Sequence, residues 1–241
     1  MSGKPWCGVR PVLAFALFLL ALGGCGYGSK AQHGNVEVFY TEGATQAEAD
    51  KLGPYLVKTW NNPADRRSVQ LKKSGAGYVF RMVIKKEMQN DPKTMTGLEI
   101  EGARISRDVF DGAAVEVQAC DEYFNTVKAL PPRADIRYGI VEGKAEIFYA
   151  TPDDKEDAQR LGKHLATKLL NAAAQVSFKL AKHDKVVEVH MVANQELLKN
   201  PAIIAGLRND RQEIAKSVFP GKEVELHLCD DHLNEIQVLK K

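Results

Sequence analysis

Two stretches of the chain carry a Cys-Asp pair in a similar setting. Residues 115–130 read VEVQACDEYFNTVKAL, and residues 224–239 read VELHLCDDHLNEIQVL. In the second stretch, period-two alternation predicts a strand with its valine and leucine side chains on one face and Glu225, His227 and Cys229 on the other. Thiol, imidazole and carboxylate groups can act as nucleophiles, bases and metal ligands. The chemistry open to these two stretches is therefore the first question.

Three interpretations of Cys120 and Cys229 stay open. Each thiol can be a small packing residue at the end of a strand. The two can form a disulfide, which requires an oxidising compartment and a Cα–Cα separation within a narrow range. Either can instead be a reactive or ligating thiol, although the neighbouring Asp121 and Asp230 disfavour the thiolate that such a role needs.

The histidines are distributed unevenly, since all except His33 lie in the second half of the chain. The candidate ligands for a zinc or copper ion are His190, His227, Cys229 and His232. The matching positions in the first half of the chain, identified below, carry only the cysteine. The fold predicted below also places another strand between the strand of His190 and that of Cys229. We therefore expect no metal or other cofactor, and interpret the histidines as surface or pH-responsive groups.

Other signatures of catalysis are missing from the sequence. It contains no GxSxG, no HExxH, no glycine-rich phosphate loop and no EF-hand pattern. Acidic clusters such as TPDDKED stand at a predicted helix start, where carboxylates favour the positive end of the helix dipole. We expect a protein that is not an enzyme.

The first 25 residues carry a positively charged start and the apolar run VLAFALFLLAL, which is too short to span a bilayer. The run ends in Leu22-Gly23-Gly24-Cys25. This motif resembles the lipobox of bacterial lipoproteins. The resemblance implies cleavage before Cys25 and acylation of that cysteine, and two or more acyl chains anchor a protein stably. The other interpretation is an ordinary secretory signal followed by a free cysteine.

The resemblance also implies a location. Gly26 follows the cysteine where many lipoproteins retained in the inner membrane carry Asp, so we expect a lipid anchor in the outer membrane, facing the periplasm, if the host is Gram-negative. Removal of residues 1–24 takes away Lys4 and Arg10 but no acidic residue, which leaves 31 basic and 31 acidic residues. A neutral chain lacks the excess positive charge that nucleic-acid binding requires, so we expect no nucleic-acid partner.

The chain contains an internal duplication with a constant offset of 109 residues, the offset between Cys120 and Cys229. GNVEVFY matches GKAEIFY, FRMV matches VHMV, and SRDVFDG matches AKSVFPG. The apolar stripe of the first predicted helix, at residues 49, 52, 56 and 60, recurs at 158, 161, 165 and 169. These units also resemble βαββαβ repeats that occur in tandem in uncharacterised bacterial proteins, a resemblance that implies no activity.

Each unit predicts the element order strand, helix, hairpin, helix, strand. Thr45 with Glu48, and Thr151 with Asp154, form capping-box patterns at the start of the first helices. This order is that of the ferredoxin-like fold. We therefore predict an α+β protein of two tandem ferredoxin-like domains, each with an antiparallel sheet and both helices on one face. TVKAL and EIQVL can add a fifth strand to each sheet.

These features divide the chain into five parts. They are a signal peptide (1–24), a lipidated tether (25–33), a first repeat domain (34–130), a linker (131–142) and a second repeat domain (143–241). Gly53 and Gly162 occupy equivalent positions inside the first helices, where glycine is unfavourable. We expect them to permit close approach of helix and sheet.

Two functional hypotheses follow. The first is a non-enzymatic, lipid-anchored envelope protein that binds or scaffolds another protein through its duplicated modules, for example by strand addition at a sheet edge. The alternative is a periplasmic carrier of a metal or small ligand, using the histidines of the second domain and Cys229. The partner or ligand cannot be named from the sequence.

Overall fold

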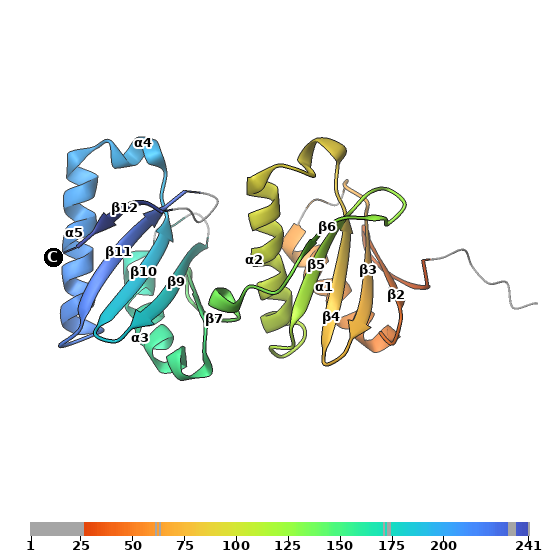
Figure 1. Ribbon diagram of the computed structural model, residues 1–241, viewed down its shortest axis with the longest axis horizontal. Coiled ribbons are helices and arrows are strands. Elements are labelled where there is room, and N and C mark those ends of the chain that lie inside the picture. Colours follow the sequence, from red (N-terminus) through yellow and green to blue (C-terminus); the bar gives the residue numbers. More distant parts are fainter. Residues whose placement is uncertain are drawn as a thin grey trace, which may run out of the picture.

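The computed structural model describes residues 27–60, 62, 64–170, 172, 175–230 and 235–240. The predicted signal peptide and Cys25 lie outside these residues, as does His232. The described chain forms two similar halves, each built on a six-stranded sheet, which stand side by side in Figure 1. Among the described residues, no helix is both long enough and apolar enough to cross a membrane.

The first half contains β1 (Ser29–His33), β2 (Val36–Thr41), α1 (Gln46–Trp60), β3 (Arg67–Ser74), β4 (Gly77–Val83), α2 (Pro92–Asp108), β5 (Val115–Cys120) and β6 (Thr126–Leu130). The second contains β7 (Tyr138–Glu142), β8 (Ala145–Tyr149), α3 (Lys155–Lys168), β9 (Val176–His183), β10 (Val186–Val192), α4 (Gln195–Leu198), α5 (Pro201–Ser217), β11 (Glu223–Cys229) and β12 (Glu235–Leu239). Short 3₁₀ turns lie at Lys86–Met88, Ala134–Ile136 and Pro152–Asp154.

The strands of each sheet lie side by side in the order in which the chain makes them. In the first sheet β2 runs parallel to β3 and β4 runs parallel to β5, while the other neighbours are antiparallel. The second sheet repeats this pattern with β8, β9, β10 and β11. The predicted antiparallel, ferredoxin-like sheet is therefore wrong. In the first half, α1 connects β2 to β3 and α2 connects β4 to β5, so each of these helices joins two neighbouring parallel strands. The second half repeats this arrangement, and each half therefore consists of two βαβ units joined by a hairpin.

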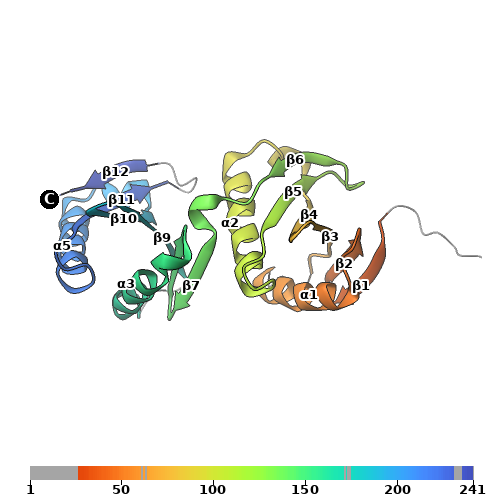
Figure 2. The ribbon, with the colours of Figure 1, turned by 60° about the horizontal axis from the view of Figure 1, so that its bottom comes forward.

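Both helices of the first half cover one face of its sheet, as predicted (Figure 2). The first core combines Leu52 and Leu56 from α1 with Leu98 and Ile105 from α2, all 5 % exposed or less. Burial of each such side chain stabilises the fold by about 1.5–3 kcal/mol. The equivalent stripe of α3 is buried in the second core. The predicted additional strands are confirmed as β6 and β12.

The edge strands β1 and β7 lie in segments that the sequence indicated to be a tether (25–33) and a linker (131–142). Each pairs antiparallel with the next strand through a two-residue turn that begins with Gly34 or Gly143 at positive φ. Among the side chains of β1 only Ala31 is buried, and none of β7 is fully buried. Because these strands are short and exposed at the sheet edge, they lack the apolar alternation that identifies a strand.

The two helical glycines act as predicted. A Cβ atom at Gly53 would overlap the ring of His33 on β1, and a Cβ atom at Gly162 would lie 3.0 Å from Cγ of Glu142 on β7. Glycine at these positions therefore lets each first helix lie against its edge strand.

The capping box predicted at α1 is also present. The backbone amide of Thr45 donates to Glu48 at 2.7 Å, and the amide of Glu48 donates to Oγ1 of Thr45 at 3.3 Å. Burial would raise the pKa of Glu48, but hydrogen bonds from Tyr78, Lys73 and Thr45 outweigh it and lower the pKa to about 2. At the start of the second half, Thr151 donates from its hydroxyl to Asp154 at 2.8 Å.

Candidate functional site

The second sheet brings two Glu-x-His sequences into register on its face away from the helices. Parallel pairing of β10 with β11 places Glu188 opposite Glu225 and His190 opposite His227. The expectation that another strand separates β10 from the Cys229 strand is wrong, because it rested on the ferredoxin-like strand order. The sheet thus aligns two carboxylates and two imidazoles on neighbouring strands.

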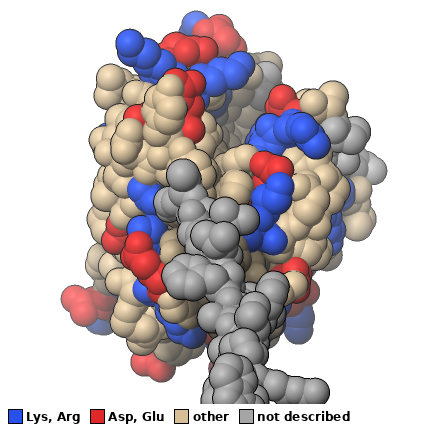
Figure 3. All heavy atoms as spheres, turned by 90° about the vertical axis from the view of Figure 1, so that its right-hand side faces the viewer, with Lys and Arg blue, Asp and Glu red and all other residues tan. Residues whose placement is uncertain are grey.

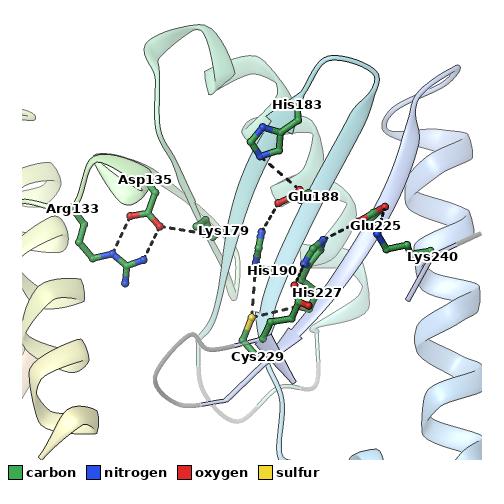
Figure 4. Close-up of polar contacts among 11 residues, drawn as sticks. Arg133, Asp135, Lys179, His183, Glu188, His190, Glu225, His227, Cys229 and Lys240 are labelled. Atoms are coloured by element: carbon green, nitrogen blue, oxygen red, sulfur yellow. Dashed lines mark hydrogen bonds and ion pairs between the residues drawn. The ribbon is translucent and has the colours of Figure 1, made fainter. Parts of the chain in front are cut away.

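The imidazole rings of His190 and His227 stack, with centroids 4.4 Å apart and planes inclined by 28° (Figure 4). Nε2 of His190 lies 3.0 Å from Glu188, and Nε2 of His227 lies 3.2 Å from Glu225. One ligand atom from each of Glu188, His190 and His227 lies within 4.8 Å of the other two. The side chains of His190 and His227 are only 14 % and 8 % exposed.

The other ring nitrogens have different partners. Nδ1 of His190 lies 3.9 Å from Sγ of Cys229, whereas Nδ1 of His227 lies 2.6 Å from Oε2 of Glu235. Neutral His190 satisfies both contacts by donating from Nε2 and accepting from the thiol. His227 faces a carboxylate on both sides, and a neutral imidazole carries only one N–H. A neutral His227 can therefore donate to only one of these two carboxylates.

Charged groups surround this cluster. Lys179, on β9 opposite His190, lies 3.2 Å from Asp135, which Arg133 also contacts. Lys240 binds Oε1 of Glu225 at 3.0 Å, on the other oxygen from the one that faces His227. Burial lowers the pKa of His190, and the charges of Lys179 and of His227 lower it further.

The first domain has a fixed positive charge at the equivalent place. The offset of 109 residues maps His190 onto Arg81 and His227 onto Gln118. The guanidinium of Arg81 donates to Gln118 at 3.1 Å and to Thr126 at 3.2 Å, and it also contacts Gln70 and the backbone oxygen of Phe124. In the first domain, uncharged groups therefore surround the guanidinium of Arg81, a positive charge that the chain itself supplies.

The cysteines lie at the ends of equivalent strands, and both are free and buried. Cys120 belongs to the first sheet and Cys229 to the second, and the disulfide, one of the three interpretations left open by the sequence, is not formed. Burial raises the pKa of each thiol, which Arg81 opposes at Cys120 and Lys179 opposes at Cys229. These surroundings match the packing interpretation better than that of an activated thiol.

A buried carboxylate joins the two domains. Glu146 on β8 is fully buried, and α2 of the first domain contacts the neighbouring β7 and extends Arg104 and Arg107 to Glu146. Nη2 of Arg104 lies 2.6 Å from Glu146, Nη1 of Arg107 lies 2.9 Å from it, and the hydroxyl of Ser177 donates to it at 2.6 Å. Burial would raise the pKa of Glu146, but its hydrogen bond and charge interaction with Arg104 lead the effects that lower it.

Glu37 and Ser68 of the first domain match Glu146 and Ser177, and Glu37 finds its partners within its own domain. Glu37 accepts hydrogen bonds from Ser68 at 3.0 Å and from Lys30 at 3.1 Å. The residue that matches Lys30 is Gly139, where a Cβ atom would lie 2.9 Å from the guanidinium of Arg107. The glycine thus makes room in the second domain for an arginine from the first.

A cavity of about 550 Å³ lies in the first domain where β3 and β4 cease to pair. Its lining includes Phe39 and Ser68. Their equivalents, Phe148 and Ser177, contact Arg107 and Arg104 of α2. In the second domain, therefore, this part of the sheet holds a helix, whereas in the first domain its counterpart lines a cavity.

The sequence identified His190 and His227 as candidate ligands and placed Glu225 on the strand face of His227, but it did not identify Glu188, Glu225, Glu235 or Glu146 as members of a site. Carboxylates that alternate with apolar residues on a strand look like exposed side chains. The signal that could have found the first two is the repeated Glu-x-His itself, but it becomes informative only when β10 and β11 are known to be neighbours.

Comparison with protein families matches the first half of the chain. Residues 30–130 match the model of the family AF_1994_N, described as a family N-terminal domain. The match covers β1 to β6 and so corresponds to the first sheet and its helices. A search of curated proteins and a search of solved structures each found no significant match.

Proposed function

We propose that the chain is a non-enzymatic, lipid-anchored envelope protein whose first domain binds a helix of another envelope protein. The observation that carries the proposal is the use of the same surface in the second domain. There, Phe148 and Ser177 receive α2, and Glu146 becomes fully buried. The equivalent surface of the first domain borders the cavity described above.

The composition of the cavity indicates what the partner helix presents. Phe39, Met82 and Phe124 provide apolar lining, and Tyr27 and Phe39 pack at 5.9 Å between ring centroids. The charged lining residues comprise three cations and two carboxylates: Arg66, Arg67, Lys85, Asp65 and Glu122. A helix that presents apolar side chains beside at least one carboxylate fits this lining. A helix like α2, with two arginines, does not.

Residues around the first strand support binding close to a membrane. Tyr27 lines the cavity and is two residues beyond Cys25, a reach of at most about 7.6 Å between Cα atoms. An acyl group on Cys25 would hold the cavity near the lipid surface. In a Gram-negative host, we propose that this surface is the periplasmic face of the outer membrane. Among the described residues visible in Figure 3, basic and acidic side chains are interspersed on this end of the molecule.

Site-specific photocrosslinking in cells tests the binding site. A photoreactive residue replaces exposed Arg66 at the cavity, and Lys216, exposed on α5 far from the cavity, serves as the control position. We expect a discrete protein adduct at position 66 only, and we expect the additional exchange Arg67→Glu to reduce it. Adducts of equal yield from both positions, an adduct with a second copy of this chain, or adducts with lipid alone would overturn the proposal.

The anchor is tested independently. We expect metabolic labelling with a fatty acid to mark the wild-type protein, and the exchange Cys25→Ser to abolish both the label and recovery in the membrane fraction. Unchanged labelling of Cys25→Ser would contradict the lipid anchor. It would leave the crosslinking experiment interpretable, because that experiment reports on the cavity.

A further inference from the structure

We propose that the second domain binds one Zn²⁺ ion between its two Glu-x-His sequences, with His190, His227, Glu188 and Glu225 as ligands. This site lies on the second sheet, apart from the cavity of the first domain, and it is independent of partner binding. The proposal rests on the positions of the donor atoms, on the groups behind them, and on the comparison between the repeats.

The donor atoms are close to the arrangement that zinc requires. A tetrahedral site with bonds of about 2.0–2.1 Å places neighbouring ligand atoms about 3.3 Å apart. The pair Glu188 and His190 is separated by 3.0 Å, and the pair Glu225 and His227 by 3.2 Å. Both histidines direct Nε2 toward the carboxylates (Figure 4). One ligand atom from each of Glu188, His190 and His227 lies within 4.8 Å of the other two, and rotation of the stacked rings would bring Glu225 onto the same ion.

The partners of the Nδ1 atoms of the two histidines match those found at zinc sites. A metal-binding histidine usually donates its other N–H to a carboxylate or another acceptor, which fixes the tautomer and orients the ring. Nδ1 of His227 faces Glu235 at 2.6 Å, so Glu235 can accept this proton while Nε2 keeps its lone pair. Nδ1 of His190 faces Cys229, which places that thiol behind the ring and not among the ligands.

The duplicated domain shows what the cluster lacks. In the first domain the guanidinium of Arg81 occupies the place of His190 and contacts the equivalents of Lys179, His227 and Glu235. The second domain replaces this cation with an imidazole and adds the carboxylates Glu188 and Glu235. A bound divalent cation would supply the positive charge that arginine supplies in the first domain. It would also satisfy the second side of His227.

The donor set favours a transition metal over calcium or magnesium. Two imidazoles with carboxylate oxygens suit zinc, whereas calcium and magnesium prefer sites made of oxygen alone. Two lysines oppose cation binding, but Lys179 is paired with Asp135, and Lys240 occupies the oxygen of Glu225 that faces away from His227. His183, 70 % exposed and 3.7 Å from Glu188, competes weakly for that carboxylate.

Zinc binding to the purified, chelator-treated full chain tests the proposal. We expect calorimetric titration with Zn²⁺ alone to give one equivalent. The double exchange H190R/H227Q installs the residues of the first domain, which already folds with them, and we expect it to abolish this binding. The control His164→Gln, in α3, should bind as the wild type does. No uptake by the wild type, or unchanged uptake by H190R/H227Q with an unchanged circular dichroism spectrum, would overturn the site.

Two further measurements distinguish the proposed metal ligands from Glu235 and Cys229, which contact the Nδ1 atoms of the histidines. We expect Glu235→Gln to weaken zinc binding about 10- to 100-fold without abolishing it. Substitution of Co²⁺ for Zn²⁺ should give the absorption of a site with nitrogen and oxygen ligands, without a sulfur-to-cobalt charge-transfer band. A sulfur-to-cobalt band in the wild type that disappears in Cys229→Ser would show that Cys229 is a ligand and would refute the proposed ligand set.

Discussion

Replacement of Glu146 by alanine tests whether the buried ion pair holds the two domains together. The carboxylate is fully buried between Arg104 and Arg107, so its removal leaves two guanidinium groups without their shared partner. Loss of one member of a buried pair costs about 3–5 kcal/mol. Arg104 is 30 % exposed and can reach water when the contact opens. We therefore expect a loss near the lower end of this range, about 3 kcal/mol.

Two measurements report this loss. The first is urea unfolding followed by far-ultraviolet circular dichroism, where 3 kcal/mol lowers the midpoint by about 1.5 M for a slope of about 2 kcal/mol/M. The second is small-angle scattering, in which separation of the domains increases the radius of gyration. Trp60 in α1 gives a fluorescence signal from the first domain, which shows whether that domain remains folded.

The duplication supplies a matched control. Glu37 occupies the equivalent position in the first domain, is 27 % exposed and pairs with Lys30 of its own domain. We expect Glu37→Ala to cost less than about 1 kcal/mol and to leave the radius of gyration unchanged. Equal effects of the two exchanges would refute the reasoning, because they would show that the interdomain contact adds nothing.

The same contact should depend on pH in a defined direction. The pKa of Glu146 is lowered in the folded protein, so its contribution is complete above the unfolded value of 4.5 and is lost as the pH falls through the folded value. The difference in stability between wild type and Glu146→Ala should therefore shrink as the solution is acidified. A difference that is constant from neutral pH to pH 3 would contradict the assignment.

Three other predictions follow from the fold. Glu48→Ala should cost about 1–2 kcal/mol at neutral pH, less than the lowered pKa alone implies because solvent screens this helix end, and the cost should vanish as the pH falls from 4.5 toward 2, measured by urea unfolding. Gly53→Ala should lower the free energy of unfolding by about 1–3 kcal/mol and Gly162→Ala by less than about 1 kcal/mol. The thermal midpoint should fall further for Gly53→Ala, and equal shifts in the two midpoints would contradict the packing. Alkylation of Cys120 and Cys229 should be slower than that of a free peptide thiol and become fast in urea; rapid native alkylation would indicate an activated thiol.

Apart from the edge strands β1 and β7 and the short helix α4, the order of helices and strands was predictable from the sequence, whereas their arrangement in the sheet was not. Apolar periodicity identified α1, α2 and the central strands because each buries one face. The same order of elements is compatible with the ferredoxin-like sheet and with the mixed sheet observed here. Which strands become neighbours depends on how each helix crosses the sheet, and periodicity within single strands contains no information about that crossing.

This limit also explains the candidate site. His190 and His227 are 37 positions apart in the chain, and only parallel pairing of β10 with β11 makes them neighbours. The carboxylates beside them were unremarkable until that pairing was known. By contrast, the role of Gly53 and Gly162 was predictable, because a residue unfavourable in a helix recurred at the same position in both repeats.

The interdomain contact joins unlike surfaces, the back of a helix and the face of a sheet, and such a contact can in principle be repeated without end. A third unit could stack on the second by the same geometry, and whole molecules could grow into filaments. Residues on the two surfaces that remain free, the first sheet and α5, disfavour such growth. At the free sheet Lys30 replaces the glycine that would admit an incoming arginine, and at the free helix Glu213 stands where Arg104 would be. Both differences oppose the addition of a further unit through the same contact.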